Sequence, residues 1–304
     1  MTTDFRNVAI IGLGLIGSSI ARATREHLPA VRLTGYDADE NVRMRARELG
    51  LAVVTDSPGA AVADADLVIL CVPVGAMAEA AASIAKGLRP TTIVSDVGSA
   101  KAAVTAALQA ALPGATIIPA HPVAGTENSG PDAGFAALFH GRWCILTPPA
   151  GADPAAVTRL GAFWSALGAR VEQMDASHHD LVLAVTSHLP HLIAYTIVGT
   201  ASDLEQITRG EVIKYSAGGF RDFTRIAASN PTMWRDIFLA NREGVLEMLQ
   251  RFNKDLAFLE EAIRAGDGDS LFDLFTRTRA IRRGIIEQKQ DVAAADFGRQ
   301  GAAS

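Results

Sequence analysis

Three polar segments of this 304-residue chain carry side chains that can move a proton or hold a ligand. They are Ser95–Lys101 (SDVGSAK), His121–Thr126 (HPVAGT) and Ser187–His191 (SHLPH). The first two follow strand-like apolar runs, and open parallel sheets bind ligands beyond the carboxyl ends of their strands. An imidazole is neutral near pH 7 and takes a proton from an alcohol as hydride leaves. His121 is therefore a candidate base for alcohol oxidation, with Ser99 as its hydrogen-bonding partner.

A glycine-rich turn near the start of the chain fits the dinucleotide-binding fingerprint. GLGLIG follows the strand-like VAII and opens a helix-like segment, and Asp37 closes the next strand-like run. The glycines permit a tight turn, backbone approach to a pyrophosphate and close helix packing. The Asp37 carboxylate would accept hydrogen bonds from ribose hydroxyls and repel a 2′-phosphate, which favours NAD over NADP. The predicted cofactor-binding residues are Gly12, Gly14, Leu15, Ile16, Gly17 and Asp37.

Several of these polar residues have a purely structural interpretation. Ser99 is also a candidate N-cap of the following helix, and Lys101 is interpreted as a solvated lysine in that helix's first turn. His188 is expected to support helix packing or a pocket wall. The histidines outside any motif are interpreted as surface residues: His27, His140, His178 and His179.

The elements that must position these residues fall into two classes along the chain. Short β-branched runs alternate with helix-compatible stretches up to about residue 174, which indicates a parallel sheet covered on both faces. The expected strands are Asn7–Ile11, Arg32–Tyr36, Leu67–Cys71, Thr92–Asp96, Thr116–Ala120, Trp143–Leu146 and Arg170–Gln173. The expected helices between them include Gly17–Glu26, Glu40–Glu48, Gly75–Ala85 and Ala100–Ala111.

From about Asp175 the pattern becomes helical throughout. The expected helices are Ala176–Ser202, Met233–Ala265 and Ser270–Ala295, with a glycine-rich loop at Ala217–Arg225 and a disordered tail at Asp296–Ser304. The predicted fold is α/β: a Rossmann-type doubly wound domain over residues 1–174, then an all-α substrate-binding and dimerisation domain over residues 175–304. Because the long apolar helices cannot bury every face within one chain, we expect a homodimer.

Composition narrows the function classes. The chain is 49% hydrophobic and 20% charged with a formal net charge of -5, so there is no electrostatic case for nucleic acid or an anionic membrane surface. Cys71 and Cys144 cannot form a disulfide framework and are expected to be buried, reduced thiols of a cytoplasmic protein. Residues 181–202 lack charged side chains, but His188, Pro190 and His191 favour a buried core helix over a membrane span.

Taken together, the motifs resemble one enzyme family. GLGLIGSS, DVGSAK, HPVAGTENSGPDAGF, SHLPHLIAY and GGFRDFTRIAASNPTMWRDIF occur in the order typical of the TyrA family of prephenate and arogenate dehydrogenases. The resemblance spans residues 8 to about 243. It implies an oxidative decarboxylation in tyrosine biosynthesis: hydride leaves the hydroxyl-bearing ring carbon for NAD+, the ring carboxylate departs as CO2, and the ring becomes aromatic. No metal is expected.

The resemblance also implies residue roles. His121 resembles the base for the ring hydroxyl, and Ser99 its partner beside the nicotinamide. Arg225 resembles the arginine that binds the ring carboxylate, a task suited to a guanidinium. The remaining members of the pocket would be His191, which reaches the substrate side chain, with Ser187, Trp234 and Asp222, the last orienting Arg225. Arg225 could instead form a structural salt bridge with Asp222, and Trp234 could serve dimer packing.

Two rival functions are considered. Rossmann dehydrogenases of the β-hydroxyacid type rely on a lysine in the first long helix of the second domain, and no lysine lies between Lys101 and Lys214. A non-catalytic, NAD-binding redox sensor would not need His121, Ser99 and Arg225. The choice between prephenate and arogenate stays open, with residues 128–134 and the surroundings of His191 as its candidate determinants. Within that segment, the acidic Asp132 could favour an ammonium group.

Overall fold

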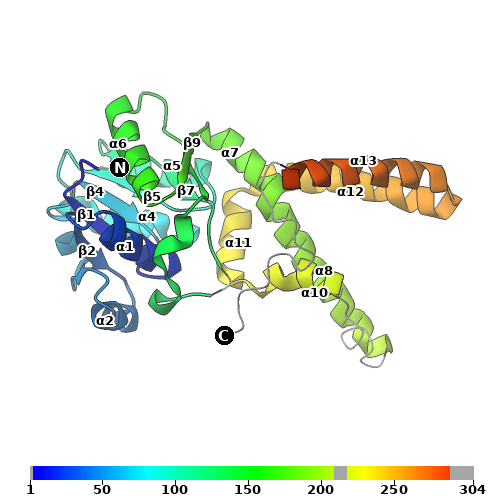
Figure 1. Cartoon of the computed structure of the whole chain (residues 1–304), viewed down its shortest axis with the longest axis horizontal. Helices are drawn as coiled ribbons and strands as arrows, with labels where there is room; N and C mark the ends of the chain where they lie inside the picture. Colours follow the sequence, from blue (N-terminus) through cyan, green and yellow to red (C-terminus); the bar gives the residue numbers. More distant parts are fainter. Residues whose placement is uncertain (1–2, 127, 209–217, 288–304) are drawn as a thin grey trace. The chain divides into compact units, whose positions relative to one another are not determined.

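The structure is a computed structural model that describes residues 3–126, 128–208 and 218–287 (Figure 1). It divides into two compact units, residues 1–246 and 247–304. The predicted site residues all lie within the range of the first unit. The predicted tail and the end of the last predicted helix lie outside the described residues, and the domain boundary at residue 174 stays a prediction.

The first unit is built around a six-stranded parallel sheet with strand order β3-β2-β1-β4-β5-β6. Its strands are β1 (Asn7–Ile11), β2 (Arg32–Tyr36), β3 (Val53–Val54), β4 (Leu67–Leu70), β5 (Ile93–Asp96) and β6 (Thr116–Ile117). The strand order reverses between β1 and β4, which creates the crevice where doubly wound sheets bind nucleotides. The predicted parallel sheet is confirmed, and β1 and β2 have the predicted bounds.

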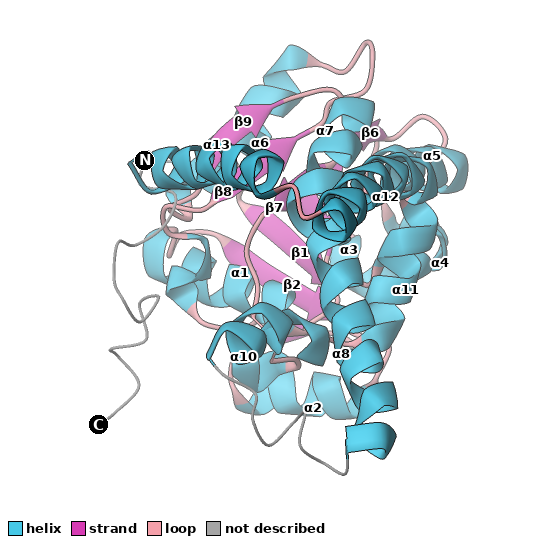
Figure 2. Cartoon of the chain, turned by 90° about the vertical axis from the view of Figure 1, so that its right-hand side faces the viewer, coloured by secondary structure: helices cyan, strands magenta, loops and turns pink. Residues whose placement is uncertain are grey.

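Helices lie on both faces of this sheet (Figure 2). They are α1 (Leu15–His27), α2 (Glu40–Glu48), α3 (Pro58–Val62), α4 (Met77–Ile84), α5 (Ala102–Ala111) and α6 (Pro154–Ala166). Alternate residues of β1 enter different cores: Ile10 packs in the core that includes Trp164 of α6, and Ile11 in the core that includes Met77 of α4. This alternation explains the continuous apolar runs of the strands.

A second sheet of three strands carries the histidine motif. It comprises β7 (Ala120–Pro122), β8 (Trp143–Leu146) and β9 (Arg170–Gln173), with β7 antiparallel to β8. The single strand expected at Thr116–Ala120 is therefore wrong, because its two ends belong to different sheets. Ile118 still donates to the Val94 carbonyl, but Pro119 has no N–H to extend the ladder, and the chain turns to pair with β8. This turn places His121 on its own short strand.

The helices after residue 175 are more broken than the sequence suggests. The first is α7 (Ala176–Leu183), which passes through a π-helical segment, η5 (Ala184–His188), into α8 (Leu189–Thr208). By length and composition, Ala176–Asp203 contains an 18-residue window that is apolar enough to cross a membrane; its mean hydropathy is 1.6, and 22% of that window is buried within the single chain. The core helix of a non-membrane protein passes the same test, so this feature alone does not decide the environment of the helix.

The following segments correct two expectations. The glycine-rich loop is mostly helical, as α10 (Gly218–Thr224) and the 3-10 helix η6 (Arg225–Ala228), with Ala217 outside the described residues. The single helix expected at Met233–Ala265 is two helices, α11 (Pro231–Ala240) and α12 (Arg242–Ala265). They are separated by Asn241, whose φ of -108° and ψ of 38° are not helical. Its side chain instead donates to the Asp180 carbonyl.

The second unit consists of most of α12 and of α13 (Gly268–Glu287). Several of its large apolar side chains are exposed in the single chain: Leu256, Phe258, Ile263, Phe272, Phe275 and Ile281. Such a concentration of exposed apolar side chains is typical of a surface that packs against a partner.

Candidate active site

The glycine-rich turn forms a cradle open to a ligand. Gly12 has a φ of +98°, and a Cβ there would lie 2.6 Å from the Cys71 carbonyl oxygen. A Cβ at Gly17 would lie 2.0 Å from the Gly12 carbonyl oxygen, so both positions need glycine for packing. A Cβ at Gly14 meets nothing within 4 Å. The space beside Gly14 is therefore available to a pyrophosphate.

The N-terminus of α1 faces this space without a cap of its own. Gly14 is the N-cap residue and supplies no side-chain hydrogen bond to the first turn. The first N–H groups of a helix lack partners within the helix and bind anions such as phosphate. Leu15 and Ile16 are half-buried at the start of α1.

Asp37 lies one residue beyond β2 and turns its carboxylate toward the glycine-rich turn. One oxygen accepts from the Leu13 N–H over 2.7 Å, and the other accepts from the Asp39 N–H over 3.0 Å. Arg43 lies nearby, donating to the Asp37 carbonyl over 2.8 Å. The sequence places an acid where a ribose would be bound, and the structure brings that acid to the glycine cradle.

His121 sits in a short hydrogen-bonded chain of side chains. The residue is 7% exposed, and its Nδ1 lies 2.8 Å from Nε2 of His179. The other nitrogen of His179, Nδ1, lies 2.9 Å from Oδ1 of Asp180. Burial lowers the pKa of His121 well below its ordinary value, and the neighbouring His179, Lys101 and His188 lower it further. His121 is therefore neutral at pH 7 and can accept a proton.

His179 corrects the sequence interpretation. It was expected at the surface, but α7 buries it completely against the histidine strand. His27, His140 and His178 are exposed, as expected. The signal that could have separated His179 from His178 is the adjacent Asp180, since an acid beside a histidine at the start of an apolar helix needs a buried partner.

Lys101 is a second correction, because its side chain is fully buried rather than solvated. Its ammonium pairs with Asp96 at the end of β5 and donates to the Ala120 carbonyl over 2.8 Å. Burial lowers the pKa of Lys101, and the Asp96 carboxylate opposes that shift. Lys101 thus joins the end of β5 to the residue before His121.

Ser99 does not cap α5. The N-cap residue is Lys101, and its side chain accepts no hydrogen bond from the first turn of α5. Instead, the Asp180 carboxylate accepts from the N–H groups of Lys101 (2.7 Å) and Ala102 (2.9 Å). Ser99 lies half-buried in the loop between β5 and α5, so its role beside the cofactor stays a prediction.

The π-helical segment η5 carries the predicted pocket residue Ser187 and, with His188, begins a cluster of rings. Burial lowers the pKa of His188 to about 4, and its Nδ1 lies 3.1 Å from Nδ2 of Asn241. Ser187 accepts, through its carbonyl, from Nδ1 of His191 over 2.8 Å. His191 stacks on Trp234, with ring centroids 3.7 Å apart. π-Helical turns are frequent at functional sites.

Trp234 has an unsatisfied donor. Its ring is buried between His191 and His188. Its Nε1 is also buried, without a hydrogen-bond partner among the described residues. Burying a donor without a partner costs free energy, so this N–H is a candidate ligand contact.

Arg225 and Asp222 come from the segment expected to be a loop. Asp222 is half-buried on α10, and Arg225 begins η6 with an exposed side chain. The Arg225 charge acts on His191, lowering its pKa in addition to the larger effect of burial. The structure therefore places the Arg225 charge within electrostatic range of His191.

Asp132 is engaged elsewhere. Nε and Nη2 of Arg45, on α2, donate to its carboxylate at 3.0 Å and 2.6 Å. This pair joins the loop after the histidine motif to the helix that follows Asp37. The expectation that Asp132 could bind a substrate ammonium has no support in this geometry, because its charge is already matched.

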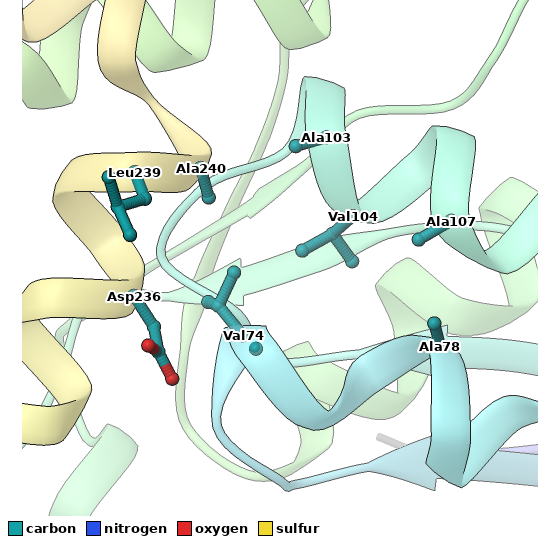
Figure 3. A pocket seen from close by; sticks show the side chains of 9 residues that line it. Val74, Ala78, Ala103, Val104, Ala107, Asp236, Leu239 and Ala240 are labelled. Carbon is teal, nitrogen blue, oxygen red and sulfur yellow. The ribbon is translucent and has the colours of Figure 1, made fainter.

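A hollow of about 380 Å³ lies apart from these residues, between α4, α5 and α11 (Figure 3). Small apolar side chains such as Ala103 and Ala107 line it, and Asp236 is the charged group at its edge. Arg235 pairs with Asp236 at 2.7 Å. None of the predicted site residues lines this hollow.

Comparisons with known proteins give a consistent result. The family profile described as prephenate dehydrogenase, nucleotide-binding domain, matches residues 20–173, and that of the prephenate dehydrogenase dimerization domain matches residues 175–277. The chain is 50% identical to a cyclohexadienyl dehydrogenase of Zymomonas mobilis, over 92% of this chain and 96% of that protein. It is 33% identical to a prephenate dehydrogenase of Bacillus subtilis, over 94% and 78% of the two chains.

Solved structures of the same family also superpose on this chain. A prephenate dehydrogenase of Aquifex aeolicus, crystallised with hydroxyphenyl propionate and NAD+, superposes with a TM-score of 0.88 and 33% identity, over 94% of this chain and 100% of that one. A Synechocystis arogenate dehydrogenase superposes with a TM-score of 0.79 and 25% identity, over 91% and 99% of the chains.

Proposed function

Because the chain belongs to the prephenate dehydrogenase family, it is an NAD-dependent oxidoreductase, and we propose that it oxidatively decarboxylates both prephenate and arogenate. The single observation that carries the proposed chemistry is the buried, neutral His121 in the same unit as an open glycine cradle. The 50% identity to a cyclohexadienyl dehydrogenase supports acceptance of both substrates.

NAD fits the cradle. The open space beside Gly14 and the uncapped first turn of α1 suit its pyrophosphate, and the Asp37 carboxylate suits its adenosine ribose. When bound, NAD+ supplies the hydride acceptor. The negative charge of Asp37 disfavours the additional phosphate of NADP.

His121 is proposed to accept the proton of the ring hydroxyl and to return it at the end of the reaction. In our proposal, its Nε2 takes this proton while hydride leaves the ring carbon that bears the hydroxyl. The bond from the ring to its carboxylate then breaks, CO2 departs, and the electron pair makes the ring aromatic. His121 returns the proton to the phenolate oxygen, so the base is regenerated. Ser99 is proposed to hydrogen-bond the reacting hydroxyl, because the two ring nitrogens of His121 are engaged by His179 and by the substrate proton.

The ring carboxylate of the substrate needs a cationic partner, and Arg225 is proposed to be that partner. A guanidinium binds a carboxylate with two parallel hydrogen bonds, and Asp222 is proposed to orient it. His191 and Ser187 would contact the substrate side chain. The indole of Trp234, stacked on His191 and holding an unsatisfied N–H, would form one wall of the pocket.

A homodimer and a cytoplasmic location complete the proposal. The exposed apolar side chains of α8 and α12, among them Ile197 and Phe258, are proposed to be covered by a second copy. The name of the matched dimerization domain supports this assembly. The two cysteines are free thiols, as expected for a reducing compartment.

The test is NADH formation by the purified protein with NAD+ and either prephenate or arogenate. We expect NADH absorbance to increase with both substrates, with kcat/KM values that differ by less than about tenfold. Growth with one substrate alone would restrict the specificity to that compound. If NAD+ binds but neither substrate yields NADH, the redox sensor becomes the better interpretation.

A further inference from the structure

We propose that His179 and Asp180 are positioning residues that hold His121 in the single tautomer whose Nε2 is free to accept a proton. The proposal deepens the proposed function, on which it rests for the role of His121 as base. It is carried by the continuous hydrogen-bonded chain from His121 through His179 to Asp180.

The direction of each hydrogen bond follows from the last member of the chain. Burial alone would raise the pKa of Asp180, but hydrogen bonds from His179 and from the N–H groups of Lys101 and Ala102 bring it below its ordinary value. Asp180 is therefore a carboxylate, which only accepts. A singly protonated His179 ring must donate from Nδ1, so that its Nε2 carries the lone pair. His121 must in turn donate from Nδ1, which leaves its Nε2 unprotonated.

Asp180 is itself held in place from three sides. Its carboxylate accepts two N–H groups at the start of α5, over 2.7 Å and 2.9 Å. Its carbonyl accepts from Nδ2 of Asn241, over 2.7 Å. The chain of hydrogen bonds therefore starts from a residue fixed by α5 and by the break between α11 and α12, so the ring of His179 has little freedom to turn away.

The surroundings of His121 make this chain necessary. Among the described residues, the titratable groups whose charge acts on His121 are His179 from α7, Lys101 from the loop before α5, and His188 from η5. Lys101 disfavours a proton on His121 in spite of its pairing with Asp96. When His121 accepts a proton, its Nδ1–H hydrogen bond to His179, backed by the Asp180 carboxylate, offsets part of that repulsion.

A direct test is the protonation of the two ring nitrogens of His121. The experiment uses full-length protein with 15N-labelled histidine at pH 7, and the His121 resonances are assigned by their loss in His121→Asn. Protonated and unprotonated imidazole nitrogens have distinct 15N shifts. We expect Nδ1 protonated and Nε2 unprotonated. A proton on Nε2 with Nδ1 unprotonated would overturn the proposal, and this result does not depend on activity.

Kinetics test the consequence. His179→Leu removes the acceptor, His179→Gln can keep one in the side-chain amide oxygen, and His178→Leu is a matched control on the exposed face of α7. We expect His179→Leu to lower kcat by about 10²-fold, with the KM values for substrate and NAD+ within threefold of wild type. His179→Gln should recover at least about tenfold, and the control should match wild type.

The outcomes separate the two proposals. A His179→Leu variant with wild-type kcat, or a folded His179→Gln variant as slow as His179→Leu, would overturn the positioning role while leaving the proposed function intact. Thermal unfolding of each variant shows whether it is folded. A wild-type protein that forms no NADH would overturn the proposed function, and the 15N measurement would still decide the tautomer.

Discussion

The ammonium of Lys101 donates to the carbonyl of Ala120 over 2.8 Å, one residue before His121. The same ammonium pairs with Asp96, which also accepts from the Gly98 N–H over 2.7 Å. One buried cation therefore connects the last residue of β5, the loop that contains Ser99, and the strand that contains His121. Lys101 therefore helps to position His121 through the backbone of Ala120 rather than through a hydrogen bond to the imidazole.

Removing this cation should destabilise the fold. Lys101→Met leaves Asp96 buried without its partner, and breaking one side of a buried pair costs about 3–5 kcal/mol. The free energy of unfolding in urea, at fixed protein concentration, measures the change. Lys101→Met combined with Asp96→Asn should recover part of the loss, and Lys86→Met, at an exposed lysine, should change stability by less than about 0.5 kcal/mol. A stable Lys101→Met single variant would refute the structural role.

Two glycines of the same motif should respond differently to alanine. Gly14→Ala places its Cβ in open space, so the fold should tolerate it while NAD+ binding weakens by about tenfold or more. Gly17→Ala places a Cβ 2.0 Å from the Gly12 carbonyl oxygen and should lower the thermal midpoint strongly. Thermal unfolding and calorimetric titration with NAD+ separate the effects. Unchanged NAD+ affinity in Gly14→Ala would remove the cradle from the cofactor site.

Cofactor choice should depend on Asp37. Asp37→Ala removes the charge that repels a 2′-phosphate, so the preference for NAD+ over NADP+, as a ratio of kcat/KM, should fall by about tenfold or more. Asp39→Ala is the control, because Asp39 caps α2 by accepting from the Asn41 N–H, and its loss should cost about 1 kcal/mol of stability with no change in the ratio. An unchanged ratio in Asp37→Ala would show that another group excludes NADP+.

Arg225 should contribute mainly to substrate binding. A hydrogen bond to a charged group contributes about 1.5–3 kcal/mol, so Arg225→Ala should raise the KM for prephenate by about 10–10²-fold. Arg225→Lys should recover only part of the loss, because an ammonium cannot form the two parallel bonds. Arg221→Ala, at an exposed arginine one turn earlier on α10, is the control. Equal KM values for Arg225→Ala and wild type would exclude Arg225 from the site.

Local pattern was sufficient for the elements with strong periodicity. The bounds of β1, β2, β8 and α2 follow from the apolar and charged spacing in each segment. The split between β6 and β7 could not be predicted in this way, because the strand that pairs with His121 lies more than twenty residues further on, and only Pro119 marks the break locally.

Burial of single polar residues was the hardest property to predict. Lys101 and Asp180 are 79 positions apart, and their contact arises only when α7 packs against the start of α5. The sequence around Lys101 is also compatible with a solvated first turn. The same long-range packing turns His179 inward while His178, its neighbour, stays exposed. Motif residues were predictable because their chemistry is local, and the residues that support them were not.

The most direct test of His121 as the base is NADH formation by wild type and His121→Asn with saturating NAD+ and prephenate, from pH 5 to pH 9. Because burial lowers the pKa of His121, the wild-type kcat should stay constant as pH falls through 6.5 and decline only below it. His121→Asn should lower kcat by about 10²–10⁴-fold at pH 7, the usual contribution of a general base, with little change in KM. A folded His121→Asn protein with kcat within threefold of wild type would contradict the assignment of His121 as the base.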